Sequence, residues 1–123
     1  MYTVKVQLEF SAGHTIRGYD GPCSRPHGHN WKVVVQARTE TLDNLGMSID
    51  FYALQNAAKE IADVYDHRDM NQLPPFDSVN PTSENVAKHF FTELKKKLPE
   101  RVRVDAVTIF ETDAYSATYS EEE

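Results

Sequence analysis

The stretch GPCSRPHGHN, residues 21–30, gathers side chains that can do chemistry: one cysteine and two histidines. His27 and His29 are separated by one glycine, and positions i and i+2 of a strand face the same way. Both imidazoles can therefore aim at one point, and Gly28 lets the backbone come close without a Cβ. An isolated H-x-H is more often an ordinary polar loop, so a third ligand is needed to indicate a metal site.

His14 can supply that third ligand. It ends the segment YTVKVQLEFSAGH, whose apolar and polar residues alternate as in a half-buried strand. If this strand pairs antiparallel with the next one across residues 15–26, His14 lies beside His27 and His29. Three neutral imidazoles with no fourth fixed protein ligand are typical of a catalytic zinc site with an open position. We therefore predict Zn²⁺ at these three histidines.

Cys23 is the only cysteine of the chain, and it precedes His27 by four positions. It could be a fourth zinc ligand that closes a structural site. It could instead act as a base or nucleophile whose thiol pKa is lowered by the nearby cation. An inert, buried thiol is the least favoured of the three alternatives, because glycine, proline, serine and arginine flank it as in an ordered turn.

Four further titratable residues lie outside this stretch. In the pair Asp66-His67, the aspartate could orient the imidazole or hold it protonated, as acid/base catalysis often needs. Taken alone, the pair is better explained by a protonated histidine that interacts with the dipole at a helix C-terminus. Glu111 could be an exposed hairpin residue or a carboxylate that reads the N–H edge of a heterocycle. His89 falls mid-helix beside a lysine, which favours a solvated face.

The elements that must position these residues follow from periodicity. Apolar residues alternate in the strand segments and recur every three or four residues in the helical ones. Ser48 or Asp50 is expected to cap the first helix, and Thr82 or Ser83 the second. The order is strand, strand, helix, helix, strand, strand, which predicts an α+β fold: a four-stranded antiparallel sheet with two helices on one face. The predicted strands and helices are residues 2–14, 29–38, 50–65, 83–98, 101–111 and 114–120.

Composition limits the function further. The 123 residues suit one domain, expected over 1–120 with an acidic tail at 121–123, and a formal charge of −6 disfavours nucleic-acid binding. We expect no membrane span, no signal peptide and a cytoplasmic location, and the lone cysteine fits a reducing compartment. The uncapped edges of a four-stranded sheet predict a homo-oligomer.

Together these segments resemble the 6-pyruvoyl-tetrahydropterin synthase and 6-carboxy-tetrahydropterin synthase family. The resemblance rests on C-x-x-x-H-G-H preceded by FSAGH and followed by DHRDMN, NPTSEN and FETD, and it runs from about residue 2 to residue 119. It implies the tunnelling (T-) fold, assembled as a hexamer of two trimers whose sheets close into barrels.

The resemblance also implies a role for each residue. His14, His27 and His29 would hold zinc, and Cys23 would be the general base. Asp66 and His67 would form a proton relay delivered from a neighbouring subunit, Glu111 would anchor the pterin ring, and Thr82 with Ser83 would assist there.

The implied reaction begins from 7,8-dihydroneopterin triphosphate. The favoured hypothesis is a zinc lyase that makes 6-carboxy-5,6,7,8-tetrahydropterin and releases triphosphate and acetaldehyde, on the route to queuosine and other deazapurines. The alternatives are a 6-pyruvoyl-tetrahydropterin synthase of biopterin synthesis and a pterin- or zinc-binding protein without turnover.

Overall fold

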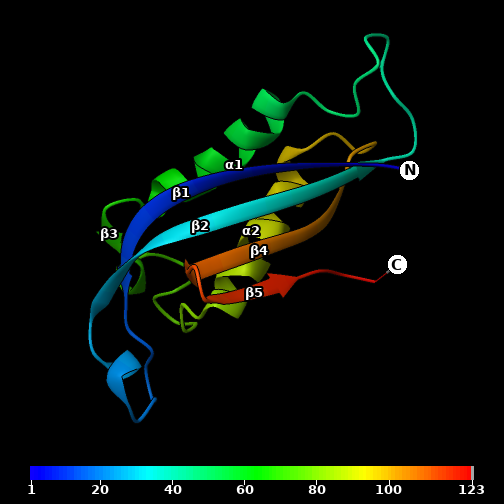
Figure 1. Ribbon diagram of the computed structural model, residues 1–123. Coiled ribbons are helices and arrows are strands. Elements are labelled where there is room, and N and C mark those ends of the chain that lie inside the picture. The colour runs from blue at the N-terminus through cyan, green and yellow to red at the C-terminus, as the bar shows by residue number, and fades with distance from the viewer. Residues whose placement is uncertain (123) are drawn as a thin grey trace.

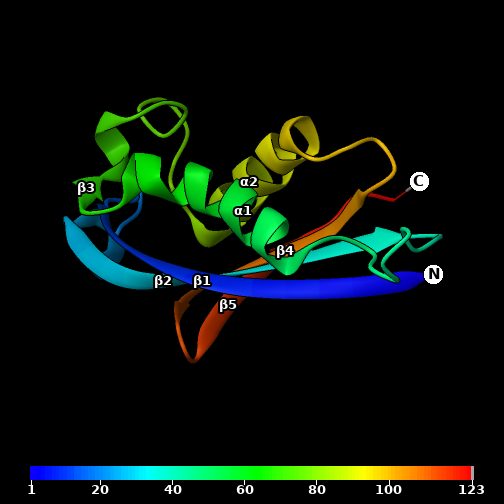
Figure 2. The same cartoon turned by 90° about the horizontal axis from the view of Figure 1, so that it is seen from above.

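A five-stranded sheet is covered on one face by two helices (Figures 1 and 2). The computed structural model describes residues 1–122, apart from the side chain of Cys23. The sheet order is β3-β1-β2-β4-β5. The elements are β1 (Tyr2–His14), a 3₁₀ turn (Pro22–Ser24), β2 (His27–Thr39), α1 (Phe51–Tyr65), β3 (Arg68–Asp69), a second 3₁₀ turn (Met70–Gln72), α2 (Ser83–Lys97), β4 (Arg103–Thr112) and β5 (Tyr115–Tyr119).

A long antiparallel hairpin of β1 and β2 is the main support of the fold. Its register runs without interruption from Tyr2 opposite Thr39 to His14 opposite His27. Alternate residues of both strands are buried beneath the helices, as the alternating pattern predicts. The pairing places the histidines of both strands at the same end of the hairpin.

Both helices begin where the sequence predicts. The Asp50 carboxylate accepts a hydrogen bond from the Tyr52 amide at 2.8 Å, and the Thr82 hydroxyl accepts one from the Asn85 amide at 3.1 Å. These bonds satisfy amides that lack a partner inside the helix. Asp50 and Thr82 are therefore the caps, rather than Ser48 and Ser83.

The core lies between the sheet and the helices. Phe10 of β1 stacks against Trp31 of β2, with ring centroids 6.1 Å apart, and against Phe90 of α2 at 5.9 Å. Val33 and Val107 continue the same buried layer along the sheet. Because the histidine end of the hairpin continues this packed layer, the site is built on a rigid base.

The prediction of a four-stranded, purely antiparallel sheet is wrong in one detail. After α1 the chain runs beside β1, and Arg68–Asp69 pairs with it in parallel, opposite Ala12 and Gly13. His67 makes the turn possible by adopting a φ of 60°. A strand of two residues is too short to show any periodicity, so the sequence pattern could not reveal it.

His89 is also not on a solvated face as predicted. Its Nε2 lies 3.1 Å from the hydroxyl of Tyr65, and its ring packs edge-on against Phe76. The loop after α1 folds back over α2 and covers this position. Across residues 1–122, none of the helices combines the length and apolar character needed to cross a membrane.

Candidate active site

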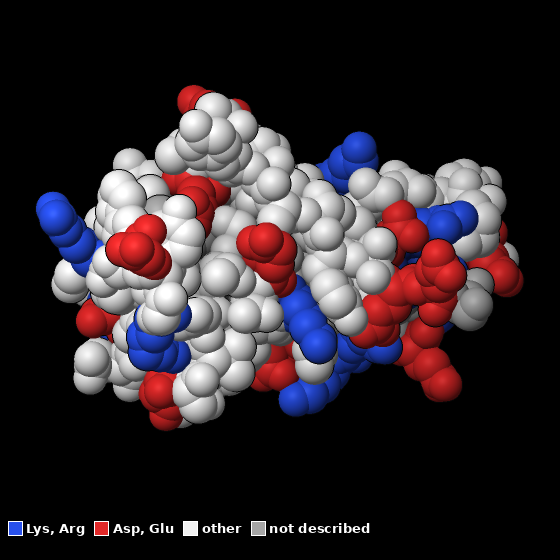
Figure 3. Space-filling model, turned by 90° about the horizontal axis from the view of Figure 1, so that it is seen from below, with Lys and Arg blue, Asp and Glu red and all other residues white. Residues whose placement is uncertain are grey.

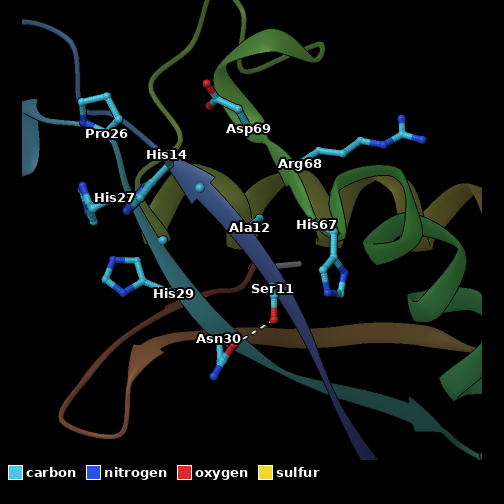
Figure 4. A pocket seen from close by; sticks show the side chains of 12 residues that line it. Ser11, Ala12, His14, Pro26, His27, His29, Asn30, His67, Arg68 and Asp69 are labelled. Atoms are coloured by element: carbon cyan, nitrogen blue, oxygen red, sulfur yellow. Dashed lines mark hydrogen bonds between the residues drawn. The ribbon is translucent and has the colours of Figure 1, made fainter.

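Three histidines converge at the end of the β1–β2 hairpin. His14 and His27 are directly opposite each other, and His29 follows on the same face of β2. One nitrogen from each ring lies within 4.8 Å of one nitrogen from each of the others. Figure 4 shows the three rings from these neighbouring strands close together at the edge of a broad, open hollow.

Hydrogen bonds to the main chain fix the tautomers of two of the rings. Nδ1 of His14 lies 2.8 Å from the carbonyl of Pro81, and Nδ1 of His27 lies 2.6 Å from the carbonyl of Arg25. A carbonyl can only accept, so each Nδ1 carries the proton and each Nε2 keeps a free lone pair. This is the arrangement that orients a metal-binding imidazole.

Burial favours the uncharged form of two of these histidines. Burial lowers the pKa of His14 and of His29, because removal from water disfavours the imidazolium form. Among the described residues, no hydrogen-bond partner is found for the buried Nε2 atoms of His14 and His29. Neutral imidazoles with buried, unpartnered lone pairs fit a divalent metal ion well.

Trp31 forms the floor of this cluster. Its ring meets His14 edge-on at 4.7 Å and His29 at 5.5 Å, and its indole N–H donates to the Ala12 carbonyl at 3.1 Å. Since Trp31 is completely buried, it restricts the rotamers of both histidines.

Glu111 joins the histidine cluster to a second pocket. One of its carboxylate oxygens lies 3.7 Å from Nε2 of His14, and its side chain is about one-quarter exposed. Thr82 and Ser83, at the start of α2, line the same pocket as Glu111. The structure therefore brings together residues predicted from three distant segments, although the Thr82 hydroxyl already caps α2.

Two tyrosines of this pocket were not predicted. Tyr19 comes from the loop after β1, and Tyr115 follows the turn between β4 and β5; both are more than half exposed. A Cβ on Gly21 would lie only 2.6 Å from the Tyr19 ring, so this glycine lets the ring lie against the loop. Periodicity says nothing about such loop residues, and only their aromatic character could have drawn attention to them.

Asp66 and His67 form a pair, with His67 Nδ1 3.1 Å from an Asp66 oxygen. The same Asp66 oxygen accepts from the Ser11 amide at 2.9 Å, and this bond is the main reason that the pKa of Asp66 is lowered. The His67 side chain is 81% exposed. Although His67 lines the same broad hollow, Figure 4 shows it across β1 from His27 and His29, with its ring not pointing towards them.

Cys23 lies in the short 3₁₀ turn between β1 and β2, at the histidine end of the hairpin (Figure 1). Its side chain lies outside the described part of the chain, so both its role as a base and its role as a ligand stay predictions. On the face shown in Figure 3, acidic side chains gather towards the right-hand end, with basic side chains beside them.

Comparison with known proteins identifies the family. The family model for 6-pyruvoyl tetrahydropterin synthase matches residues 3–122, nearly the whole chain. The chain belongs to this family. Its relatives include both members named for the carboxy product and members named for the pyruvoyl product.

Three examples show this division within the tetrahydropterin synthases. The 6-carboxy-5,6,7,8-tetrahydropterin synthase of Rickettsia bellii is 30% identical, over 86% of this chain and 91% of its own length. The human 6-pyruvoyl tetrahydrobiopterin synthase is 36% identical, over 97% and 91%. The solved structure of the Caenorhabditis elegans 6-pyruvoyl tetrahydropterin synthase superposes with a TM-score of 0.87 at 29% identity, covering 98% and 96% of the two chains.

Proposed function

We propose that this protein is a zinc-dependent lyase that converts 7,8-dihydroneopterin triphosphate into 6-carboxy-5,6,7,8-tetrahydropterin. The reaction consumes one water and releases triphosphate and acetaldehyde. The observation that carries the proposal is the convergence of three imidazoles, of which that of His14 has its Nε2 3.7 Å from Glu111, a residue that lines a second pocket. One half of this arrangement suits a metal, and the other suits a flat heterocycle with N–H donors.

The metal half of the site fits zinc best among the common biological cations. Three nitrogen ligands and no fixed fourth ligand among the described residues match a catalytic rather than a structural zinc site. Zn²⁺ bound here would place positive charge beside the side-chain hydroxyls of the substrate and so acidify the neighbouring C–H protons. Harder ions such as Mg²⁺ prefer oxygen ligands, which this cluster lacks.

The chain's own residues would divide the remaining work. Glu111 accepts hydrogen bonds from the ring N–H and exocyclic amine of the pterin, with Thr82 and Ser83 beside it. Cys23 takes a proton from the substrate side chain. His67, oriented by Asp66 at 3.1 Å, carries a proton on the opposite face.

The ring of His67 does not point at the histidine cluster of its own chain, which supports delivery from a neighbouring copy. We therefore propose a homohexamer, a dimer of trimers, in which each site is completed by a second chain. Sedimentation velocity should give a species of about six chains. Mixing inactive Cys23→Ala chains with inactive His67→Ala chains should restore activity, because some sites then combine an intact Cys23 with an intact His67.

Mass spectrometry of products tests the reaction. Zinc-loaded protein is incubated with 7,8-dihydroneopterin triphosphate, and acetaldehyde is trapped as a hydrazone. A 6-carboxy product with an equal amount of trapped acetaldehyde supports the proposal, whereas the Cys23→Ala variant should give neither. Unchanged substrate with protein of full zinc content would contradict it and would favour a protein that binds pterin or zinc without turnover.

The second candidate is 6-pyruvoyl-tetrahydropterin formation. It is favoured by the extent of the human match, which covers 97% of this chain against 86% for the rickettsial carboxy enzyme. A 6-pyruvoyl product without acetaldehyde would establish it. X-ray absorption addresses the role of Cys23 separately, because a Zn–S shell near 2.3 Å would make Cys23 a ligand.

A further inference from the structure

Two asparagines hold the segment that follows His14 in the same unusual way. The side-chain oxygen of Asn71 accepts from the Thr15 amide at 2.8 Å, and its side-chain nitrogen donates to the Thr15 carbonyl at 2.9 Å. Asn80 repeats this arrangement on Arg17, at 2.9 Å for both bonds. Each asparagine thus mimics a neighbouring strand and satisfies both polar groups of one residue.

These asparagines come from a loop that is itself anchored to the core. Asn71 follows Met70, which is fully buried, and Asn80 precedes Pro81 and the cap of α2. The Asn80 main-chain carbonyl accepts from the Asn85 side chain at 2.9 Å. The loop therefore gives the asparagines a fixed platform from which to hold Thr15 and Arg17.

The held segment is placed between the two halves of the site. His14, a member of the histidine cluster, directly precedes Thr15. Ile16 lies between the two clamped residues and lines the pocket of Glu111. The guanidinium of Arg17 donates to the Phe76 carbonyl at 2.7 Å, which ties the same segment to the loop a third time.

The loop also reaches the ring of His14. The Pro81 carbonyl, one residue after Asn80, accepts from Nδ1 of His14 at 2.8 Å. These contacts form a closed ring. The main chain runs from His14 to Arg17, and Arg17 is hydrogen-bonded to Asn80. Pro81, the next residue after Asn80, accepts the hydrogen bond from the His14 imidazole. The backbone and the imidazole of one ligand are thereby fixed by the same loop.

We infer that Asn71 and Asn80 are positioning residues that hold the metal site and the Glu111 pocket at a fixed position relative to each other. This inference deepens the proposed function and rests on it for the role of the pocket. Loss of a group that orients a metal ligand typically costs about 10–100-fold in metal affinity. We expect an effect of this size from each asparagine, because each acts through its hydrogen bonds to the main chain that follows His14.

Zinc affinity measured with a competing chelator tests the inference without any substrate. Asn71→Ala and Asn80→Ala should each bind Zn²⁺ about 10–100-fold more weakly. Asn56→Ala, at an exposed position of α1, is the matched control and should keep the affinity of the original chain. Amide hydrogen exchange of the metal-free protein should show faster exchange at Thr15 in the first variant and at Arg17 in the second.

Aspartate variants serve if an alanine variant fails to fold. Asn71→Asp and Asn80→Asp keep an acceptor for the amide but set an oxygen against the carbonyl, so zinc affinity should still fall at least threefold, an estimate of about half the logarithmic loss expected for alanine. Unchanged zinc affinity in folded variants would overturn the inference, even if their melting temperatures drop, because the asparagines would then only stabilise the fold. If the variants lose zinc affinity as expected but the original chain forms no lyase product, this inference stands and the proposed function is contradicted instead.

Discussion

The substitution His29→Phe tests whether His29 is a metal ligand or a structural histidine, because the two roles predict different changes in the stability of the metal-free protein. The His29 ring packs between His14, His27 and Trp31, and no partner is found for its buried Nε2 among the described residues. Phenylalanine keeps an aromatic ring there and removes the unsatisfied nitrogen. We therefore expect the metal-free variant to unfold at the same temperature as the original chain or higher, because an unpaired buried polar atom costs about 1–3 kcal/mol.

Zinc should make the original chain the more stable of the two proteins. A ligand at one hundred times its dissociation constant stabilises the folded state by about 2.7 kcal/mol. For a domain of this size such a gain raises the melting temperature by roughly 10 °C. The original chain should show this rise, and His29→Phe should show almost none at the same zinc concentration, as followed by differential scanning calorimetry with and without zinc.

His89→Phe is the control, because it removes a partly buried histidine outside the cluster. It loses the 3.1 Å contact with Tyr65, so the metal-free protein should be destabilised by about 0.5–1.5 kcal/mol while the zinc-induced rise persists. The two variants should thus behave in opposite ways. A full zinc-induced rise in His29→Phe, or a metal-free variant less stable than His89→Phe, would refute the assignment of His29 as a ligand.

Other predictions address the second pocket and the response to pH. Glu111→Gln should weaken pterin binding by about 10–100-fold, through the loss of charge-assisted hydrogen bonds, without changing zinc affinity. Calorimetric titration can measure both affinities, with Glu40→Gln, at an exposed position outside this pocket, as the control. Thr82→Ala should lower the free energy of unfolding by about 1 kcal/mol in urea, and Ser83→Ala should leave it nearly unchanged, because Thr82 is the cap of α2. Removal from water lowers the pKa of His14, His29 and His89, so the unfolded chain binds more protons than the folded one at mildly acidic pH. The metal-free protein should therefore lose stability as pH falls below about 6.5, the pKa of an ordinary histidine, and a melting temperature that stays constant down to pH 5 would contradict this.

The sequence predicts the elements of this fold that have a repeating pattern. The alternation before His14 and the helical spacing after Asp50 were enough to locate β1 and α1, and pairing the two strands placed His14 beside His27. Periodicity works there because one face of each element must be buried.

Predictions from the sequence fail where a loop from elsewhere in the chain determines the surroundings of a residue. The sequence predicts a solvated face for His89 because helical spacing counts only the residues of its own helix, whereas Phe76 contacts it from another segment. The asparagines Asn71 and Asn80 are ordinary loop residues by composition, and only the three-dimensional structure reveals their pairing with Thr15 and Arg17. No local pattern encodes such a contact, since it joins positions more than fifty residues apart.

The position of Trp31 gives the protein its own optical probe of occupancy. It is the only tryptophan of the chain, and its ring lies edge-on to two of the three histidines at 4.7 and 5.5 Å. An ion such as Co²⁺ or Cu²⁺ at the histidines would quench emission from an indole at that range, while Zn²⁺ would change it only through local structure. Ultraviolet fluorescence can therefore follow the exchange of one metal for another in the unlabelled protein, in real time and at concentrations too low for calorimetry.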